Sequence, residues 1–403
     1  MKQNKDQQRQ YYLDWLRVFA TGAVFILHCA HIFDEVPYHI KNGETSRLLG
    51  ALVLFLNYWI MPLFFFIAGG ASHFSLSTRN GKAYIKERIQ RLIIPFIAGS
   101  ILFTLLQNYA EALNHRVFSG SFLSFLKYEF NYCIIYIETG KLTFSPRIFG
   151  ILGHHLWFLM FLFIYSLITF PLFRLMTKGR NNHEDSAVSG REVNRRLYIG
   201  PLILFAISSI LSPIDPEYEG WSTFFQWGLF FTMGFFILSN AKAVKTIKLR
   251  WKIHLISGTV SFICSAILLI RSNLTFFSGP SISGTFVLYS LCAAVTSWSW
   301  TFALIGIAGN KLNSTNTMLP QLSRGAMPFY ILHQPVILLL ALFIVNWHAG
   351  IAVKLIAIFF SALVCTSLIV SVLILPSCRI SFLFGIKGKR KEKKELDFTD
   401  IIR

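Results

Sequence analysis

The sequence predicts an all-helical protein that crosses a lipid membrane about ten times, with both termini in the cytoplasm. Of the 403 residues, 54% are hydrophobic and only 14% are charged, whereas a soluble protein carries about a quarter charged residues. The mean hydropathy is +0.54. No hydrophilic stretch approaches the size of a domain. We therefore expect one membrane domain over residues 1–376 and a basic cytoplasmic tail over residues 377–403.

Apolar runs long enough to span a bilayer recur along the chain, since a spanning helix needs about 20 mostly apolar residues. They lie at 13–32, 49–72, 92–110, 154–173, 198–214, 222–240, 253–270, 284–308, 326–347 and 351–375. The fifth and sixth runs are the weakest, because only SPIDPEYEG separates them. The chain shows no internal repeat at a fixed period.

The distribution of Lys and Arg sets the predicted orientation, since these residues accumulate in cytoplasmic loops. With the N-terminus inside, the inner segments hold 30 of the 38 Lys and Arg residues and the outer segments hold 8. This asymmetry explains most of the net charge of +19. We therefore expect the basic residues to face the lipid bilayer and the cytoplasm, and we expect no nucleic-acid partner.

The six cysteines are scattered and form no CxxC pair, so the sequence predicts neither a disulfide framework nor a metal site. The N-terminus has about ten polar residues followed by a long apolar run without a small-residue cleavage site. This pattern indicates an uncleaved first span and not a signal peptide.

The first predicted span contains an arginine and a histidine whose spacing places them on one face. Arg17 and His28 are eleven residues apart, which is about 20° from three full turns and roughly 16 Å along a helix axis. His31 lies one turn further along nearly the same stripe. By the predicted orientation, Arg17 sits at the cytoplasmic end and His28 sits past the membrane midplane.

A histidine at membrane depth has a structural and a functional interpretation. Alone, it is more often hydrogen-bonded to a neighbouring helix than catalytic. The aligned arginine favours function, because Arg17 can hold a phosphate while His28 performs acid–base chemistry deeper in the membrane. A ligand with a charged nucleotide end and a long pantetheine arm, coenzyme A, fits this arrangement.

A second basic pair, Arg88 and Arg91 in KERIQRLIIPF, lies at the cytoplasmic entry to the third span. At i, i+3 spacing the two side chains share a helix face, and guanidinium groups suit phosphate. An ordinary positive-inside anchor is the alternative interpretation.

Taken together, these motifs resemble the acyltransferase 3 family of membrane proteins. The segment YYLDWLRVFATGAVFILHCAHIF resembles the family's first helix, with its R-x10-H motif matched by Arg17 and His28. The segment RIQRLIIP is similar to the family's R-x-x-R motif, matched by Arg88 and Arg91.

Two later segments complete the resemblance, which covers nearly the whole chain. HHLWFLMFLFIYSL resembles the family's Leu-Trp-Phe-Leu segment, here residues 156–159. SRGAMPFYILHQPVIL resembles its late Tyr-x-x-His helix, here Tyr330 and His333. Within the family, YYLDWLRV and ILHQPV look most like the glucan biosynthesis protein C branch.

The resemblance implies an O-acyltransferase in the bacterial inner, or plasma, membrane. Acyl-CoA would enter from the cytoplasm as a co-substrate, with no tightly bound cofactor. Its acyl group, acetyl or succinyl, would pass to a hydroxyl of a carbohydrate or cell-envelope glycan. His28 would be the catalytic residue, as general base or transient acyl carrier, and Arg17, Arg88 and Arg91 would hold the phosphates.

The sequence does not identify which residue orients His28. No Asp or Glu lies in the interior of a predicted span, so a carboxylate-oriented dyad is in doubt. The candidates that remain are His31, Asn57, His154, His155, Tyr330 and His333. His154 and His155 point about 100° apart on a helix, so we expect them to have different roles.

Two further features complete the sequence-based predictions. Lys354, near the start of the last span, is expected to extend outward to the membrane surface. The outer segment 111–152 is expected to pack on the membrane or to cover a cavity.

A transporter or exporter of a glycan or lipid-linked precursor is the alternative function, and a non-catalytic scaffold is a third. Transporters often have repeated halves and intramembrane carboxylates, and this sequence shows neither.

Overall fold

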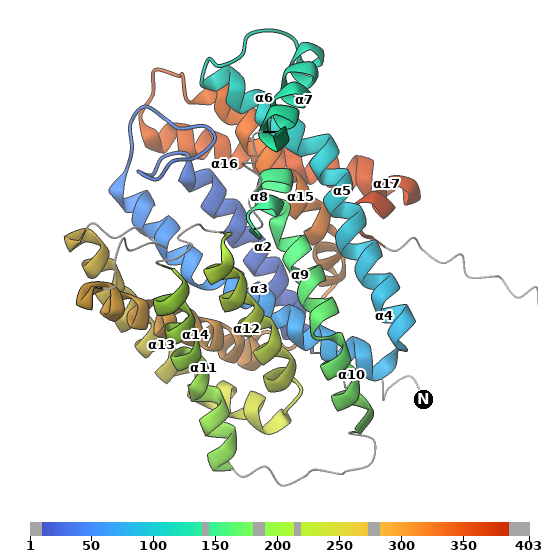
Figure 1. The fold of residues 1–403 in the computed structure, drawn as a ribbon, viewed down its shortest axis with the longest axis vertical. Helices are drawn as coiled ribbons and strands as arrows, with labels where there is room; N and C mark the ends of the chain where they lie inside the picture. Colours follow the sequence, from blue (N-terminus) through green and yellow to red (C-terminus); the bar gives the residue numbers. More distant parts are fainter. Residues whose placement is uncertain (1–9, 139–144, 180–189, 213–218, 273–282, 387–403) are drawn as a thin grey trace, which may run out of the picture.

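The computed structural model describes residues 10–138, 145–179, 190–212, 219–272 and 283–386, and these residues form helices without any β-strand. Most of the predicted tail, residues 387–403, lies outside the described residues. Figure 1 shows the helices gathered side by side into one bundle, with the loop between α2 and α3 at one end. The prediction of an all-helical fold is confirmed.

The helices begin and end as follows. The first part of the chain forms α2 (Tyr11–His31), α3 (Arg47–Thr78), α4 (Gly81–Arg88), α5 (Ile94–Gly99), α6 (Leu105–Asn114) and α7 (Phe122–Glu138). The middle part forms α8 (Ile148–Gly153), the 3-10 turn η3 (His154–Leu156), α9 (Trp157–Ile168), α10 (Phe170–Gly179), α11 (Gly190–Leu211) and α12 (Trp221–Leu238). The last part forms α13 (Ala241–Arg271), α14 (Gly284–Lys311), α15 (Met318–Ile344), α16 (Ile351–Leu368) and α17 (Cys378–Leu383).

Among the described residues, 9 helical segments are long and apolar enough to cross a membrane. They coincide with nine of the ten predicted runs. The run at 198–214 falls on α11, whose first third, GREVNRR, is largely polar. The last two residues of the run lie outside the described residues. The cytoplasmic placement of the termini stays a prediction.

The third span is one continuous helical segment, Gly81–Asn114, with two π-helical turns at Ile89–Ile93 and Ser100–Thr104. Pro95 has no backbone N–H to donate to the carbonyl four residues earlier, that of Arg91. The first π turn lies directly before this proline. Single π turns within α-helices are frequent at functional sites, and this one carries Arg91.

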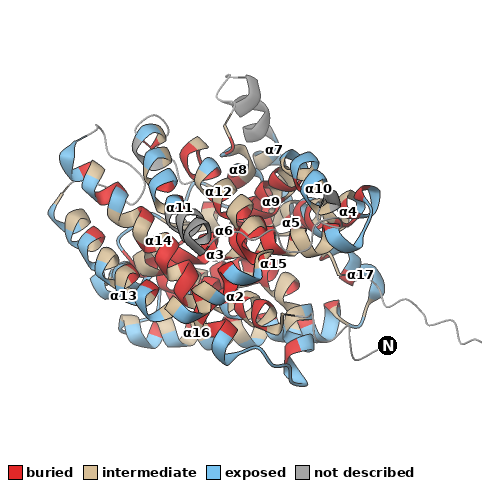
Figure 2. Cartoon of the chain, turned by 90° about the horizontal axis from the view of Figure 1, so that it is seen from below, coloured by how far each residue is buried: buried red, intermediate tan, exposed pale blue. Residues whose placement is uncertain are grey.

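Burial separates central helices from peripheral ones. The apolar windows of α3 and α15 are both 61% buried, whereas those of α13 and α16 are 17% and 22% buried. Figure 2 shows the same division, with buried residues concentrated on α2, α3 and α15 and exposed residues on α13 and α16. Since a row of large apolar residues, mostly isoleucine, is exposed along α13 from Leu249 to Ile270, these outer helices present a lipid-facing surface.

The central helix α3 packs closely against α12 because each helix places a glycine against the backbone of the other. A Cβ atom on Gly69 would lie 1.8 Å from the carbonyl oxygen of Phe231, and one on Gly234 would lie 2.0 Å from that of Phe66. Small residues of this kind allow close helix approach within membranes. The contact fixes α3, which connects directly to the loop that carries part of the site described below.

We expect Gly69→Ala and Gly234→Ala to destabilise the protein by about 1–3 kcal/mol, because neither backbone can move away without disturbing the α3–α12 contact. Gly22→Ala in α2 is the matched control, since a Cβ atom added to Gly22 would meet nothing within 4 Å. Thermal unfolding in detergent would measure the effect. Equal melting temperatures for all three variants would contradict the close contact.

Candidate active site

Helix α2 carries both residues of the predicted R-x10-H motif. It is unbroken from Tyr11 to His31, so Arg17 and His28 are separated by about 16 Å along one axis. Arg17 Nη1 lies 3.1 Å from Asp14 Oδ1, an i, i+3 pair. The Arg17 side chain is still 40% exposed, and it can therefore contact another anion.

Two histidines from distant parts of the chain, His155 and His333, lie beside His28. The ring centroid of His28 lies 5.1 Å from that of His333 and 6.2 Å from that of His155, and the latter two are 5.1 Å apart. We call His28, His155 and His333 the histidine cluster. It joins α2, η3 and α15. Within the described residues, no group of three or more His, Cys, Asp or Glu side chains is arranged to hold a metal ion.

Hydrogen bonds to one carbonyl define the protonation of two members of the cluster. His155 Nε2 lies 3.1 Å and His333 Nδ1 lies 2.6 Å from the carbonyl oxygen of Tyr330. A carbonyl oxygen can only accept, so both of these nitrogens carry the proton. In the neutral rings, His155 Nδ1 and His333 Nε2 are then acceptors. Both are buried and have no partner among the described residues.

Tyr330 ties η3 to α15 from both of its polar groups. Its hydroxyl donates to the carbonyl of His155, while its own carbonyl accepts from the two histidines. Pro335, one turn further along α15, cannot donate to the carbonyl of Ile331, and this carbonyl also lies beside the His155 ring. The role of Tyr330 in the structure is therefore to hold the cluster in place.

Tyr38 orients His28. Its hydroxyl lies 2.9 Å from His28 Nδ1, and its ring packs against His31 with centroids 4.4 Å apart. Tyr38 belongs to residues 32–46, between α2 and α3, which we call the α2–α3 loop. Burial, together with nearby Cys29 and the carboxylates of Asp34 and Glu111, raises the pKa of Tyr38 well above its usual value. The hydroxyl therefore stays neutral and leaves His28 Nε2 for chemistry.

A buried carboxylate anchors the α2–α3 loop. Asp34 is fully buried, and its carboxylate lies 2.5 Å from His31 Nδ1 and accepts a hydrogen bond of 2.7 Å from Lys41 Nζ. Burial alone would raise the pKa of Asp34, but the hydrogen bonds and charges of His31 and Lys41 outweigh burial and lower it. The ionised carboxylate therefore holds both ends of the segment that contains Tyr38.

Lys354 also supports this loop, and the prediction that it extends outward was wrong. Its side chain is only 8% exposed. Its ammonium group donates to Asn42 Oδ1 at 2.9 Å and to the carbonyl of Val345 at 2.8 Å. The reason is geometric: Lys354 lies in the first turn of α16 beside the α2–α3 loop, where two oxygens provide better partners than the membrane surface.

The two adjacent histidines have different surroundings, because they lie in a tight turn and not in a regular α-helix. His155 joins the histidine cluster, whereas His154 Nε2 lies 2.5 Å from Asn108 Oδ1 and its ring lies 4.4 Å from that of His39. The backbone of His154 has φ 47°, a conformation uncommon for residues other than glycine. This turn between α8 and η3 is what directs the two rings to different places.

The end of α6 and helix α7 cover the site near His154. Asn108 Nδ2 donates to Glu129 Oε1 at 2.7 Å, and His39 Nδ1 lies 2.6 Å from Glu111 Oε2. Glu129 belongs to α7, within the outer segment 111–152 that was expected to cover a cavity. Residues 139–144 of that segment lie outside the described residues.

Arg88 and Arg91 lie around a buried carboxylate at the far end of the third span. Arg91 Nε is 3.3 Å from Glu87 Oε1, and Arg79 pairs with the same carboxylate. The Arg88 guanidinium packs over the Tyr84 ring at 4.8 Å and forms a long 3.5 Å contact with Ser72 Oγ. With one carboxylate among three guanidinium groups, this cluster keeps a positive charge.

Sequence comparison assigns the chain to a family. The family model for the acyltransferase domain of the acyltransferase 3 family matches residues 10–375. The chain belongs to the acyltransferase 3 family. The resemblance seen in its motifs is thereby confirmed, and the apolar helices indicate an integral membrane protein.

Curated relatives of this acyltransferase 3 family member are similar over less than half of the chain. Proteins named "Glucans biosynthesis protein C" from Escherichia coli strains K12, K12 / DH10B and O1:K1 / APEC are each 26% identical over 180 residues. The match covers 44% of this chain and 42% of each relative. No solved structure matches the chain.

The structure brings some of the predicted site residues together and separates others. His28, His155, His333 and the backbone of Tyr330 form one centre, and His31 adjoins it through Tyr38. Arg88 and Arg91 form a separate group on the third span, and Asn57 lines a different cavity. The residue that sequence reasoning missed is Tyr38, for which a tyrosine among three nearby histidines, His31, His28 and His39, was the available signal.

We expect Asp34→Asn to destabilise the α2–α3 loop by about 1–3 kcal/mol, because a buried carboxylate that accepts charged hydrogen bonds is replaced by an amide. Hydrogen exchange of residues 32–46 and thermal unfolding would measure this loss. Glu35→Gln is the matched control, since Glu35 is 61% exposed in its pair with Arg47 and should matter little.

The difference in stability between wild type and Asp34→Asn should depend on pH. Because the folded-state pKa of Asp34 lies below the ordinary value of 3.8, its stabilisation is present at neutral pH and is lost as the pH falls through the lowered pKa. The difference between wild type and Asp34→Asn should therefore narrow in acid. A constant difference down to pH values below this range would contradict the assigned role.

Proposed function

We propose that this acyltransferase 3 family member transfers an acyl group from acyl-CoA to a hydroxyl of a carbohydrate, with His28 as general base. The observation that carries the proposal is the hydrogen bond of 2.9 Å between Tyr38 and His28 Nδ1, inside a cluster of three imidazoles. A base that a partner holds at one nitrogen, with the other nitrogen left for the substrate, is suited to remove a proton from an alcohol.

In the proposed reaction, His28 Nδ1 donates to the Tyr38 oxygen and His28 Nε2 takes the proton of the acceptor hydroxyl. The hydroxyl oxygen attacks the thioester carbon, so that a carbon–oxygen bond forms while the carbon–sulfur bond breaks. The proton then passes from His28 to the departing sulfur, which leaves as the free thiol of CoA. The products are an acylated carbohydrate and CoA, and no other reactant is needed.

The two remaining histidines support proton movement in this scheme. His155 Nδ1 and His333 Nε2 are buried acceptors beside His28. An imidazolium formed at His28 would lie beside two neutral rings, which do not repel its positive charge. The proton can then be retained near the reacting atoms until the sulfur takes it.

The arginines would hold the other end of the donor. Arg17 lies about 16 Å from His28 along α2, a separation suited to the extended pantetheine arm between the nucleotide phosphates and the thioester. Arg88 and Arg91 supply further positive charge for phosphate. The predicted orientation places all three on the cytoplasmic side, where acyl-CoA is available.

The acceptor class rests on different support. Relatives that carry the name "Glucans biosynthesis protein C" match part of the chain, and the histidine cluster lies toward the opposite end of α2 from Arg17. Both favour a glycan of the bacterial cell envelope that is reached from the outer side of the inner membrane. The acyl group is acetyl or succinyl.

Catalysis and donor binding should be separable by mutation. His28→Ala is expected to abolish release of free CoA thiol from acetyl-CoA or succinyl-CoA, in the presence of a crude cell-envelope glycan, but to leave acyl-CoA binding intact. Arg88→Ala and Arg91→Ala are each expected to weaken acyl-CoA binding by about 1–3 kcal/mol, since a charge-assisted hydrogen bond is lost. Thiol titration and isothermal calorimetry would measure the two effects.

The controls are His348→Ala, an exposed histidine outside the cluster, and Lys86→Ala, an exposed cation on α4 beside Arg88. Neither control should change either measurement. Thiol release that persists in His28→Ala would contradict the catalytic assignment. A wild-type protein that binds no acyl-CoA would favour the transporter alternative.

A further inference from the structure

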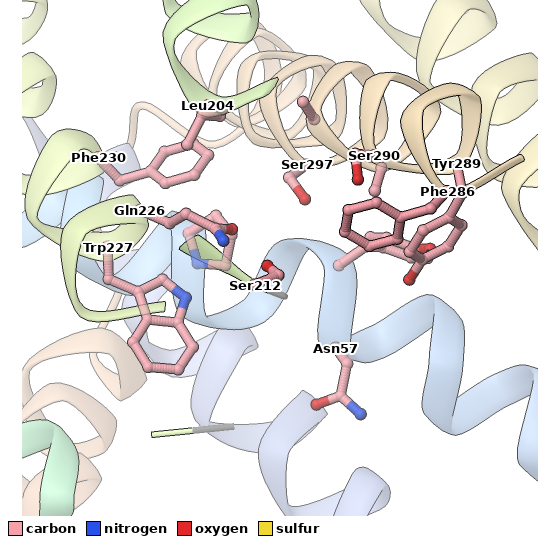
Figure 3. Close-up of a pocket in the computed structure, with 14 residues that line it drawn as sticks. Asn57, Leu204, Ser212, Gln226, Trp227, Phe230, Phe286, Tyr289, Ser290 and Ser297 are labelled. Atoms are coloured by element: carbon pink, nitrogen blue, oxygen red, sulfur yellow. The ribbon is translucent and has the colours of Figure 1, made fainter. Parts of the chain in front are cut away.

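A second polar site lies inside the bundle, between α3, α11, α12 and α14 (Figure 3). Counted over the positions that the centre of a water molecule can take, its volume is about 50 Å³. The space itself extends a water radius further on every side, so it is several times larger than one water molecule. The space can therefore hold several ordered waters or a small polar ligand.

The lining combines uncharged polar groups with aromatic rings. Asn57, Gln226, Ser290 and Ser297 supply amide and hydroxyl groups, and Trp227 and Tyr289 supply ring surfaces. Figure 3 shows Gln226, Ser212 and Ser297 directed toward the space that these helices enclose. Among the described residues that line the cavity, none carries a charge.

Three of these polar side chains make no hydrogen bond within the described part of the protein. Asn57 from α3 and Ser290 and Ser297 from α14 line the cavity, and Ser290 is 2% exposed. Polar groups at membrane depth are costly when left without partners. Their convergence on one cavity from two helices indicates a place where a polar ligand supplies the missing hydrogen bonds.

The wall that α3 supplies to the cavity also contains a proline and a tyrosine. Pro62 lies inside α3 and lines the cavity. Tyr58 lines the cavity as well, and its hydroxyl donates to the hydroxyl of Tyr289 at 3.3 Å.

The cavity is connected to the histidine cluster through stacked rings. Trp227 in the cavity wall stacks on Trp157, with centroids 4.6 Å apart and planes inclined by 20°. Trp157 begins α9 directly after η3, the turn that contains His155. The position of the cavity wall is therefore fixed relative to the candidate catalytic residues.

The cavity also lies toward the end of the bundle where the α2–α3 loop is found. Tyr58 of α3 and Gln226 of α12 both line the cavity. Twelve residues further along the same two helices, Gly70 of α3 faces Leu238 of α12. The helices α3 and α12 therefore run in the same direction. Asn57 lies ten residues after the start of α3, and His28 lies three residues before the end of α2.

We propose that this cavity binds one uncharged sugar unit of the acceptor glycan. That the bound glycan is the acceptor rests on the proposed function, whereas the binding of a sugar in this cavity does not. Neutral amide and hydroxyl groups match sugar hydroxyls, and aromatic faces match the apolar faces of the ring. None of the described lining residues carries a charge that could pair with a phosphorylated or acidic sugar, which favours an uncharged sugar at this position.

The test measures glycan binding by the full chain in lipid nanodiscs without acyl-CoA. The probes are a neutral glucose tetrasaccharide and an acidic galacturonic acid tetrasaccharide, followed by isothermal calorimetry. The neutral probe should bind wild type. Its affinity should fall about tenfold or more in Ser290→Leu, which fills the cavity, and severalfold in Asn57→Ala, which removes about one hydrogen bond. Thr285→Leu, an exposed residue of the same helix, should bind as wild type does.

Two results would overturn the inference: no binding of the neutral probe to wild type, or equal binding by wild type, Ser290→Leu and Asn57→Ala. Tighter binding of the acidic probe would overturn the uncharged class. Thermal unfolding shows whether each variant is folded. If Ser290→Leu does not fold, Asn57→Ala alone still tests the inference. Thiol release, scored separately, reports on the proposed acyl transfer, so that either claim can fail while the other stands.

Discussion

The hydrogen bond between Tyr38 and His28 is the interaction on which the site depends. A histidine at membrane depth has two equivalent-looking nitrogens, and only a fixed partner at one of them makes the other a defined base. Here the partner is supplied by a loop and not by a helix. The loop is held by the buried carboxylate of Asp34 and by the ammonium of Lys354, both of which lie outside the motifs that identify the family. Support for the site therefore reaches from α2 to the last span.

The fold followed from the sequence because its physical causes are local. Runs of about 20 apolar residues must form helices in a bilayer, where every backbone group needs an internal partner. The one disagreement, at α11, arose because the first third of this helix, GREVNRR, is largely polar and includes three arginines. The face shared by Arg17 and His28 was also predictable, since helix geometry depends on spacing alone.

The assembly of the site was not predictable, because it depends on contacts between distant segments. His28, His155 and His333 were each identified, but their meeting requires the packing of α2, η3 and α15. Tyr38 was missed because it lies between spans and belongs to no motif. Lys354 was misjudged because outward extension is the usual behaviour of a lysine at a helix end, and only the folded structure shows the two oxygens that hold it. The cavity at Asn57, likewise, is formed by four helices together.

The most direct test of the account is a comparison of Tyr38→Phe with wild type in steady-state acyl transfer. Removing the hydroxyl leaves the ring against His31 but no longer fixes His28, so kcat should fall about tenfold, with acyl-CoA affinity and melting temperature unchanged. The pH dependence of kcat should also shift, because the nitrogen that Tyr38 contacts no longer has a fixed partner. Unchanged kcat and an unchanged pH profile would contradict the central claim that Tyr38 holds His28 in its catalytic orientation.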